Sequence, residues 1–203
     1  MSRYPVPRET ARIEYHVSNS RFISTIGRAE TVETARAFIQ SVRDEMPDAT
    51  HHVYAFRVGY GSSVTEGMSD DGEPSGTSGP PALAVLRGSG IGDVVLVITR
   101  YFGGTKLGTG GLVYAYTNAA KEAVTALPIE EKVVRKLVGV TMPYTLYERF
   151  KRLLEVYDGM LDGEEFAGDV TVYAYLPQEN IPPFTDEIRE LSAGQVAPIV
   201  LDE

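Results

Sequence analysis

The chain has 203 residues, of which 43% are hydrophobic and none is cysteine, so it can bury one sizeable core or two small ones but cannot form disulfide bonds or thiolate metal sites. Its net charge of −9 is unevenly spread, because residues 1–127 carry 12 Lys and Arg against 13 Asp and Glu, whereas residues 128–203 carry 7 against 15. The first part can therefore hold a local basic patch, while the second should repel polyanions.

The N-terminal sequence MSRYPVPRET lacks the apolar region of a secretory signal, and no segment approaches the roughly 20 apolar residues that a membrane span needs. We therefore expect a cytoplasmic protein with no membrane and no disulfide partner. Two short β-rich segments follow at residues 13–17 and 22–27, and the turn-forming SNS between them predicts a hairpin.

A helical period of apolar residues runs over 32–46, with Thr31 as the expected N-cap and Pro47 beyond the end. Residues 51–59 predict a strand, whereas residues 61–78 show no sustained period.

Two adjacent prolines at 80 and 81 suit the first turn of a helix that ends at the glycines 88 and 90. The continuous apolar run over 93–99 predicts a strand buried on both faces. A further helix should bury an apolar face from Leu112 to Leu127, and these elements together make an α+β domain over residues 1–127.

The remaining residues predict a second domain over 132–203, with the boundary at residues 128–131. A strand is expected over 132–142, a helix over 144–157, two strands of which the second alternates cleanly over 170–176, a short helix from Pro182 or Pro183, and a last strand near 198–201. This βαββαβ order is typical of a ferredoxin-like fold.

Two glycine-rich motifs carry a resemblance to a known family. They are DDGEPSGTSGPP at residues 70–81 and TRYFGGTKLGTGG at residues 99–111, and together they resemble the signature of the IMPACT family, in particular its bacterial YigZ-like group. The resemblance implies an N-terminal domain similar to the second domain of small-subunit ribosomal protein five, with a left-handed β-α-β crossover. It also implies that the ferredoxin-like domain resembles the fifth domain of elongation factor G.

The second motif is the main candidate site, because it leaves the end of a buried strand and leads into a helix N-terminus, where unpaired backbone N–H groups favour anions. In one interpretation Arg100 and Lys106 contact phosphate, and Tyr101 or Phe102 stacks on a base. Backbone N–H groups from the glycines complete the contacts. These glycines are Gly103, Gly104, Gly110 and Gly111.

In the other interpretation the aromatic residues are core, the glycines make turns, and Arg100 pairs with a carboxylate of residues 70–73. The motif is not a Walker loop, since Leu107 follows Lys106. Two departures from the family pattern weaken the first interpretation. Tyr114 stands where a basic residue is usual, and Thr117 with Asn118 replaces a glycine pair.

Asp70, Asp71 and Glu73 place three carboxylates around Gly72. They could bind Mg²⁺, but a structural role such as pairing with Arg100 is the expectation, and we predict no metal and no cofactor. Alternation along the strand allows only one of His51 and His52 to face a site, and His52 is the member that the family resemblance favours.

The favoured function is a non-catalytic, translation-associated protein whose N-terminal domain contacts RNA, the ribosome or a translation factor, with a possible role in regulating translation. The alternative is an enzyme that acts on a small phosphorylated molecule, with Asp71, Glu73, Arg100 and Lys106 around a pocket. An open basic face around Arg100 would favour the first, and a closed, carboxylate-lined pocket the second.

Overall fold

A computed structural model describes residues 3–201, so the outermost residues of both expected domains, 1–2 and 202–203, lie outside the described part. The chain divides into two units, one from Tyr4 to Lys132 and the other formed by Arg3 and the described residues from Val133 onward. The α+β class and the two-domain architecture expected from the sequence are confirmed.

A five-stranded antiparallel sheet organises the first unit, with the strand order β2-β3-β6-β4-β5. The strands are β2 (Ala11–Val17), β3 (Ser20–Arg28), β4 (His51–Tyr60), β5 (Ser63–Ser69) and β6 (Val94–Tyr101). The expected apolar strand is the central β6, which is buried on both faces because helices cover both sides of the sheet.

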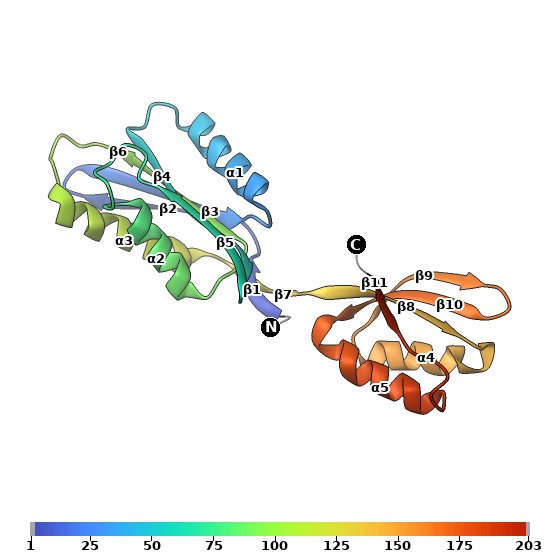
Figure 1. Cartoon of the computed structure of the whole chain (residues 1–203). Coiled ribbons are helices and arrows are strands. Elements are labelled where there is room, and N and C mark those ends of the chain that lie inside the picture. Colours follow the sequence, from blue (N-terminus) through green and yellow to red (C-terminus); the bar gives the residue numbers. More distant parts are fainter. Residues whose placement is uncertain (1–2, 202–203) are drawn as a thin grey trace. The chain divides into compact units, whose positions relative to one another are not determined.

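Helix α1 (Val32–Glu45) covers one face of this sheet, and α2 (Gly79–Ser89) and α3 (Gly108–Ala126) cover the other (Figure 1). The strands β3 and β4 are joined through α1 and lie on either side of β6, so the unit contains the expected β-α-β crossover. Thr31 caps α1 as predicted, since its hydroxyl accepts the Thr34 N–H at 3.1 Å.

Alternation along β6 divides the apolar side chains of the first unit between two cores. Val95 and Val97 point toward α1, whereas Leu96 and Ile98 point toward α2 and α3. The central strand is therefore fixed from both sides, and its end at Tyr101 has a defined position.

A two-stranded ribbon of β1 (Arg3–Pro7) and β7 (Ile129–Val133) completes the first unit. Asp93 fastens it, because its carboxylate accepts the Tyr4 hydroxyl at 2.8 Å and the Lys132 ammonium at 2.7 Å. The strand expected over 132–142 is therefore two strands, β7 and β8, of which the first belongs to this ribbon.

The second unit has the expected βαββαβ order and a four-stranded antiparallel sheet, β11-β8-β10-β9, backed by two helices. Its elements are β8 (Arg135–Met142), α4 (Tyr144–Val156), β9 (Met160–Phe166), β10 (Val170–Pro177), the short 3-10 helix Gln178–Asn180, α5 (Ile181–Leu191) and β11 (Ile199–Leu201). This is the ferredoxin-like arrangement. None of the helices within residues 3–201 has the length and apolar character needed to cross a bilayer.

Candidate functional site

The residues singled out in the sequence meet at one end of the five-stranded sheet. The register pairs Arg21 with Tyr101 and His51 with Arg100, so the starts of β3 and β4 lie beside the end of β6. The turn at residues 70–73, which follows the neighbouring β5, lies at the same end. Segments that are far apart in the sequence thus form one continuous site.

Arg100 is buried at the centre of this site and is paired with a carboxylate. Its Nη1 donates to Glu73 Oε1 at 2.6 Å, and the two side chains are only 5% and 3% exposed. Arg100 Nη2 donates to Ser20 Oγ at 3.3 Å, and the Tyr116 hydroxyl donates to Glu73 Oε1 at 2.7 Å. The alternative in which Arg100 pairs with a carboxylate of residues 70–73 therefore describes the contact that is present.

Aromatic rings enclose the guanidinium of Arg100. Its Cζ lies 5.4 Å from the centroid of Phe22 and 5.5 Å from that of Phe102, and Tyr116 packs edge-on against Phe22. Burial and the adjacent Glu73 carboxylate raise the pKa of the Tyr116 hydroxyl, which stays protonated as the donor. A direct contact of Arg100 with phosphate would require this pair to break.

The two histidines face opposite sides of β4, as alternation requires. His51 Nδ1 lies 2.8 Å from the Asp71 carbonyl oxygen, to which it must donate, and its Nε2 lies 3.8 Å from Glu73 Oε2. His52 turns to the other face, where its Nδ1 lies 3.1 Å from Thr99 Oγ1 and where burial lowers its pKa. The structure thus brings His51, rather than the expected His52, to Glu73.

The three carboxylates of the turn have three different sets of partners. Asp70 accepts the backbone N–H groups of Gly76, Ser78 and Gly79 at 2.8, 3.0 and 2.8 Å, so it occupies the N-terminus of α2 in the way that a bound anion would. Burial by itself would raise the pKa of Asp70, but these hydrogen bonds have the larger combined effect and hold the pKa below its ordinary value.

Asp71 pairs with Arg43 at 2.5 Å and accepts the His52 backbone N–H at 2.6 Å, while Glu73 pairs with Arg100. The three carboxylates therefore bond to different groups and do not converge on one point. Within residues 3–201 no three acidic or histidine side chains form a group that could hold a metal ion.

The glycine-rich loop between β6 and α3 is held at its base and exposed beyond it. Gly103 donates its N–H to Ser20 Oγ at 3.3 Å, and a Cβ at this position would lie 2.0 Å from the Asn19 carbonyl oxygen. Only glycine fits there. Gly104 has a φ of +86° and is exposed, as is Lys106.

Phe102 is 46% exposed, although one face of its ring covers Arg100. The guanidinium of Arg21 stacks 4.6 Å from the ring centroid of Tyr101, whose hydroxyl donates to Asp48 Oδ1 at 3.0 Å, and alternation along β6 puts this pair on the α1 face. Arg21 was not expected from the sequence, and its position follows from its register with Tyr101.

The N-terminus of α3 is open. No side chain of the described residues caps it, whereas Asp70 accepts the N–H of Gly79 at the start of α2, and the first turn of α3 contains no acidic residue. Gly110 is exposed and has no neighbour where a Cβ would lie, whereas a Cβ at Gly111 would be 3.1 Å from Leu107. The residues that follow β6, together with this helix end, form one surface, which we call the loop surface: Phe102, Gly104, Lys106 and Gly108–Gly111.

The loop surface is not part of the cavity that lies between α2 and α3, which has a volume of about 670 Å³. Sequence reasoning also missed Ser20 and the hydroxyl role of Tyr116, and it preferred His52 to His51. Tyr116 carries the period of a core position, and nothing in that pattern indicates that its hydroxyl meets Glu73, which is 43 residues away in the sequence.

Comparison with known proteins was made for the whole chain. Residues 18–124 match the model of the Impact N-terminal domain, and residues 140–195 match a domain of unknown function (DUF1949). An IMPACT family member of Haemophilus influenzae is 36% identical, with 97% of this chain and 96% of that protein covered. The IMPACT family member YigZ of Escherichia coli is 34% identical over 100% of both chains.

A solved structure titled "Crystal structure of an hypothetical protein" is 34% identical to this chain, and it superposes with a TM-score of 0.73 over 100% of this chain and 99% of that one. The similarity therefore covers both units.

Proposed function

This chain belongs to the IMPACT family, and we propose that it is a translation-associated binding protein whose N-terminal unit contacts RNA, the ribosome or a translation factor through the loop surface. Family membership supports a general role in the regulation of translation. The observation that carries the more specific proposal is an exposed aromatic and cationic loop that leads into an open helix N-terminus.

Each part of the loop surface suits a polyanion with bases. The unpaired backbone N–H groups at the start of α3 and the ammonium of Lys106 favour a phosphate, because both present positive charge to solvent. Phe102 offers an exposed ring on which a base can stack.

The buried pair supports this surface from below. Arg100 and Glu73 hold the end of β6 against the turn at residues 70–73, and Ser20 ties Gly103 to the same network. In this proposal Arg100 is a positioning residue for the loop, while Lys106 and Phe102 make the contacts. The excess of acidic residues after residue 127 keeps a polyanion on the N-terminal unit.

The test is binding of the full chain to a fluorescent single-stranded RNA and to purified ribosomes over a range of salt concentrations. Lys106→Gln should weaken binding and reduce the magnitude of the log-affinity against log-salt slope by about 0.7 to 0.9, the value of one lost phosphate contact. Phe102→Ala should weaken binding with the slope unchanged, because it removes stacking and no charge.

Arg36→Gln is the matched control, since Arg36 is an exposed cation on α1, on the opposite face of the sheet. If Lys106→Gln and Arg36→Gln change the slope equally, the attraction is a property of the whole protein and the loop surface is not the site. The proposal would also be contradicted if wild-type protein binds neither RNA nor ribosomes and no protein of the translation machinery binds to it through Lys106 and Phe102.

An enzyme acting on a small phosphorylated molecule remains a second candidate because ionisable groups gather under the loop. His51 Nε2 and Glu73 Oε2, both acceptors when the histidine is neutral, face each other at 3.8 Å. This candidate predicts saturable stabilisation of the chain by a nucleoside monophosphate or a sugar phosphate in thermal unfolding. His51→Gln should abolish that stabilisation, whereas RNA binding through the loop surface would be unaffected by this change.

A further inference from the structure

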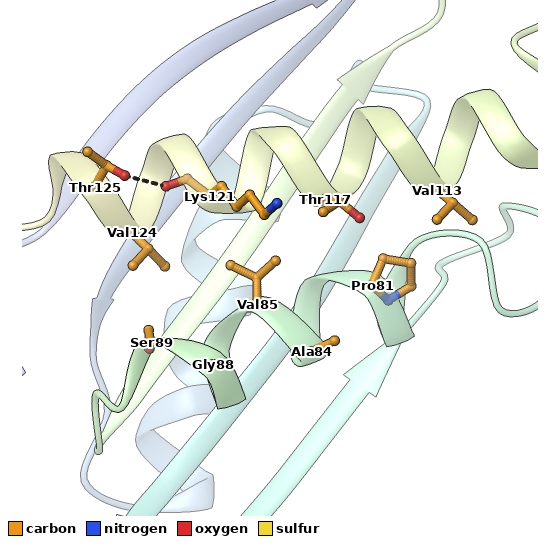
Figure 2. Close-up of a pocket in the computed structure, with 10 residues that line it drawn as sticks. All are labelled: Pro81, Ala84, Val85, Gly88, Ser89, Val113, Thr117, Lys121, Val124 and Thr125. Carbon is orange, nitrogen blue, oxygen red and sulfur yellow. Dashed lines mark hydrogen bonds between the residues drawn. The ribbon is translucent and has the colours of Figure 1, made fainter.

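A groove runs between α2 and α3 on the side of these helices that faces away from the sheet (Figure 2). It has a volume of about 670 Å³ and is lined by Pro81, Ala84, Val85, Gly88, Ser89, Val113, Thr117, Lys121, Val124 and Thr125. None of these residues belongs to the loop surface. The inference drawn from this groove is therefore independent of the function proposed above.

Helix α3 carries apolar side chains on two faces, although its own fold needs only one. The buried face is formed by Leu112, Ala115, Tyr116, Ala119, Ala120 and Ala123. A second stripe lines the groove and consists of Val113, which is 39% exposed, the threonine Thr117, and Val124, which also packs against the core beneath. A helix on the surface of a globular unit normally presents polar residues on this side, so the stripe suits a contact outside the fold.

The floor of the groove on α2 is equally apolar and has small side chains. Ala84 and Val85 precede Gly88 by about one helical turn, and the three residues leave room between the two helices (Figure 2). Small residues at such positions allow the side chains of a third helix to enter.

The described lining of the groove contains one charged residue. Lys121 is the only charged residue among the described lining residues, and no carboxylate lines it. The ammonium of Lys121 has no ion-pair or hydrogen-bond partner within residues 3–201, and its side chain lies along the α3 edge of the groove in Figure 2. An occupant therefore meets an apolar floor and an unpaired cation at the edge, which a carboxylate would complement.

The dimensions favour a helix over a small ligand. At a rise of about 1.5 Å per residue, the lining segments span about 12 Å along α2 and about 18 Å along α3. This length holds two to three turns of a helix, roughly 8 to 12 residues. The groove is open along its side, so a small molecule would remain largely in water, whereas an amphipathic helix would bury its apolar stripe.

We propose that the groove between α2 and α3 docks an amphipathic helix of a partner protein, with the apolar stripe of that helix between Ala84 and Val113 and a carboxylate of the partner on Lys121. The site is distinct from the loop surface, so both can be occupied at once.

Two synthetic peptides of about 18 residues, long enough to form a helix, test this proposal. They share leucines at helical spacing on one face, and they differ only in the residues that flank this stripe, which are glutamates in one peptide and lysines in the other. Binding to the full chain is measured by fluorescence polarisation. The glutamate peptide should bind wild-type protein about tenfold more tightly than the lysine peptide, because one attraction replaces one repulsion.

The variant Lys121→Glu should reverse that order. Arg36→Glu, which changes the net charge by the same amount on α1, should leave the order unchanged and serves as the matched control. Both variants change exposed residues, and an unaltered melting temperature verifies their folding.

The proposal is overturned if the two peptides bind wild type equally, if Lys121→Glu and Arg36→Glu act alike, or if neither peptide binds at about 1 mM, the weak limit for a specific contact. It is also overturned if sedimentation shows that the full chain self-associates and that Lys121→Glu dissociates it, since the occupant is then a second copy.

Discussion

Replacing Glu73 by glutamine should destabilise the first unit by about 3 to 5 kcal/mol, the usual result of removing one partner from a buried ion pair. The guanidinium of Arg100 is 5% exposed and has Glu73 as its only carboxylate within 4 Å among the described residues. Glutamine keeps the shape of the side chain and an acceptor for the Tyr116 hydroxyl. The loss of stability therefore measures the cost of an uncompensated buried charge and not the cost of a cavity.

A double-mutant cycle separates the pair from its surroundings. Arg100→Met alone should also be strongly destabilising, because it leaves the carboxylate of Glu73, 3% exposed, with the Tyr116 hydroxyl in place of a cation. The double variant Arg100→Met with Glu73→Leu should lose far less than the sum of the single variants, since an apolar pair of similar volume requires no compensation. We expect a coupling energy of about 3 kcal/mol.

The measurement is urea unfolding of the full chain at pH 7, followed by circular dichroism because the chain has no tryptophan. Hydrogen exchange assigns the change to residues 4–132. The exposed pair of Arg12 and Glu45, with side chains 41% and 53% exposed, is the matched control, and the same cycle there should give a coupling of at most about 1 kcal/mol. Equal coupling for the two pairs would refute the argument that burial makes the Arg100 pair decisive.

Two further predictions concern the loop and the turn. Gly103→Ala should cost at least about 2 kcal/mol, because its Cβ would meet the Asn19 carbonyl oxygen at 2.0 Å, whereas Gly110→Ala has open space and should change stability by less than about 0.5 kcal/mol; equal unfolding midpoints would contradict this. Asp70→Asn should cost about 1 kcal/mol at neutral pH. Because the pKa of Asp70 is lowered in the fold, its contribution is fully present above the unfolded value of about 3.9 and is lost as pH falls through the lower folded pKa. The difference from wild type should therefore begin to shrink near pH 4 and vanish once the pH is below the folded pKa, and a difference that does not shrink on acidification would show that geometry and not charge is responsible.

Long periodic segments could be predicted from the sequence because their pattern has a single explanation. The helical period and capping residue of α1 fixed its start at Val32, and the alternation in β10 led to the ferredoxin-like order of the second unit. In each case an apolar face and a polar face alternate with the period of the element, and the core that they cover is local.

Two strands could not be predicted, for physical reasons that differ. In β5 (Ser63–Ser69) the apolar residues are few, because it is an edge strand that pairs only with β4 and buries little. In β1 (Arg3–Pro7) two prolines oppose a strand assignment, and its partner β7 lies more than 100 residues away. Neither the edge position of β5 nor the distant partner of β1 can be read from a short window of sequence.

The sequence singled out the segment of the candidate site, but its internal pairing could not be derived. The sequence left open whether Arg100 meets a phosphate or a carboxylate, and register decides which neighbours it has, because β3 and β4 bring Ser20 and His51 to it from positions 80 and 49 residues away. That Lys106 and the exposed glycines contact a ligand remains a prediction.

The internal partners of the motif also determine which of its residues are available to a ligand. Asp70 holds the start of α2, Asp71 holds Arg43, and Glu73 holds Arg100, so the acidic half of the motif stabilises the end of the sheet. The side chains of Phe102 and Lys106, which follow Arg100, are exposed, and within the described residues neither pairs with a carboxylate. A loop that must bind a polyanion beside three carboxylates gains from this arrangement, since each negative charge is already neutralised or capped before the ligand arrives. Loss of any one internal partner should therefore weaken an anion contact at the loop surface by exposing negative charge, in addition to its effect on stability.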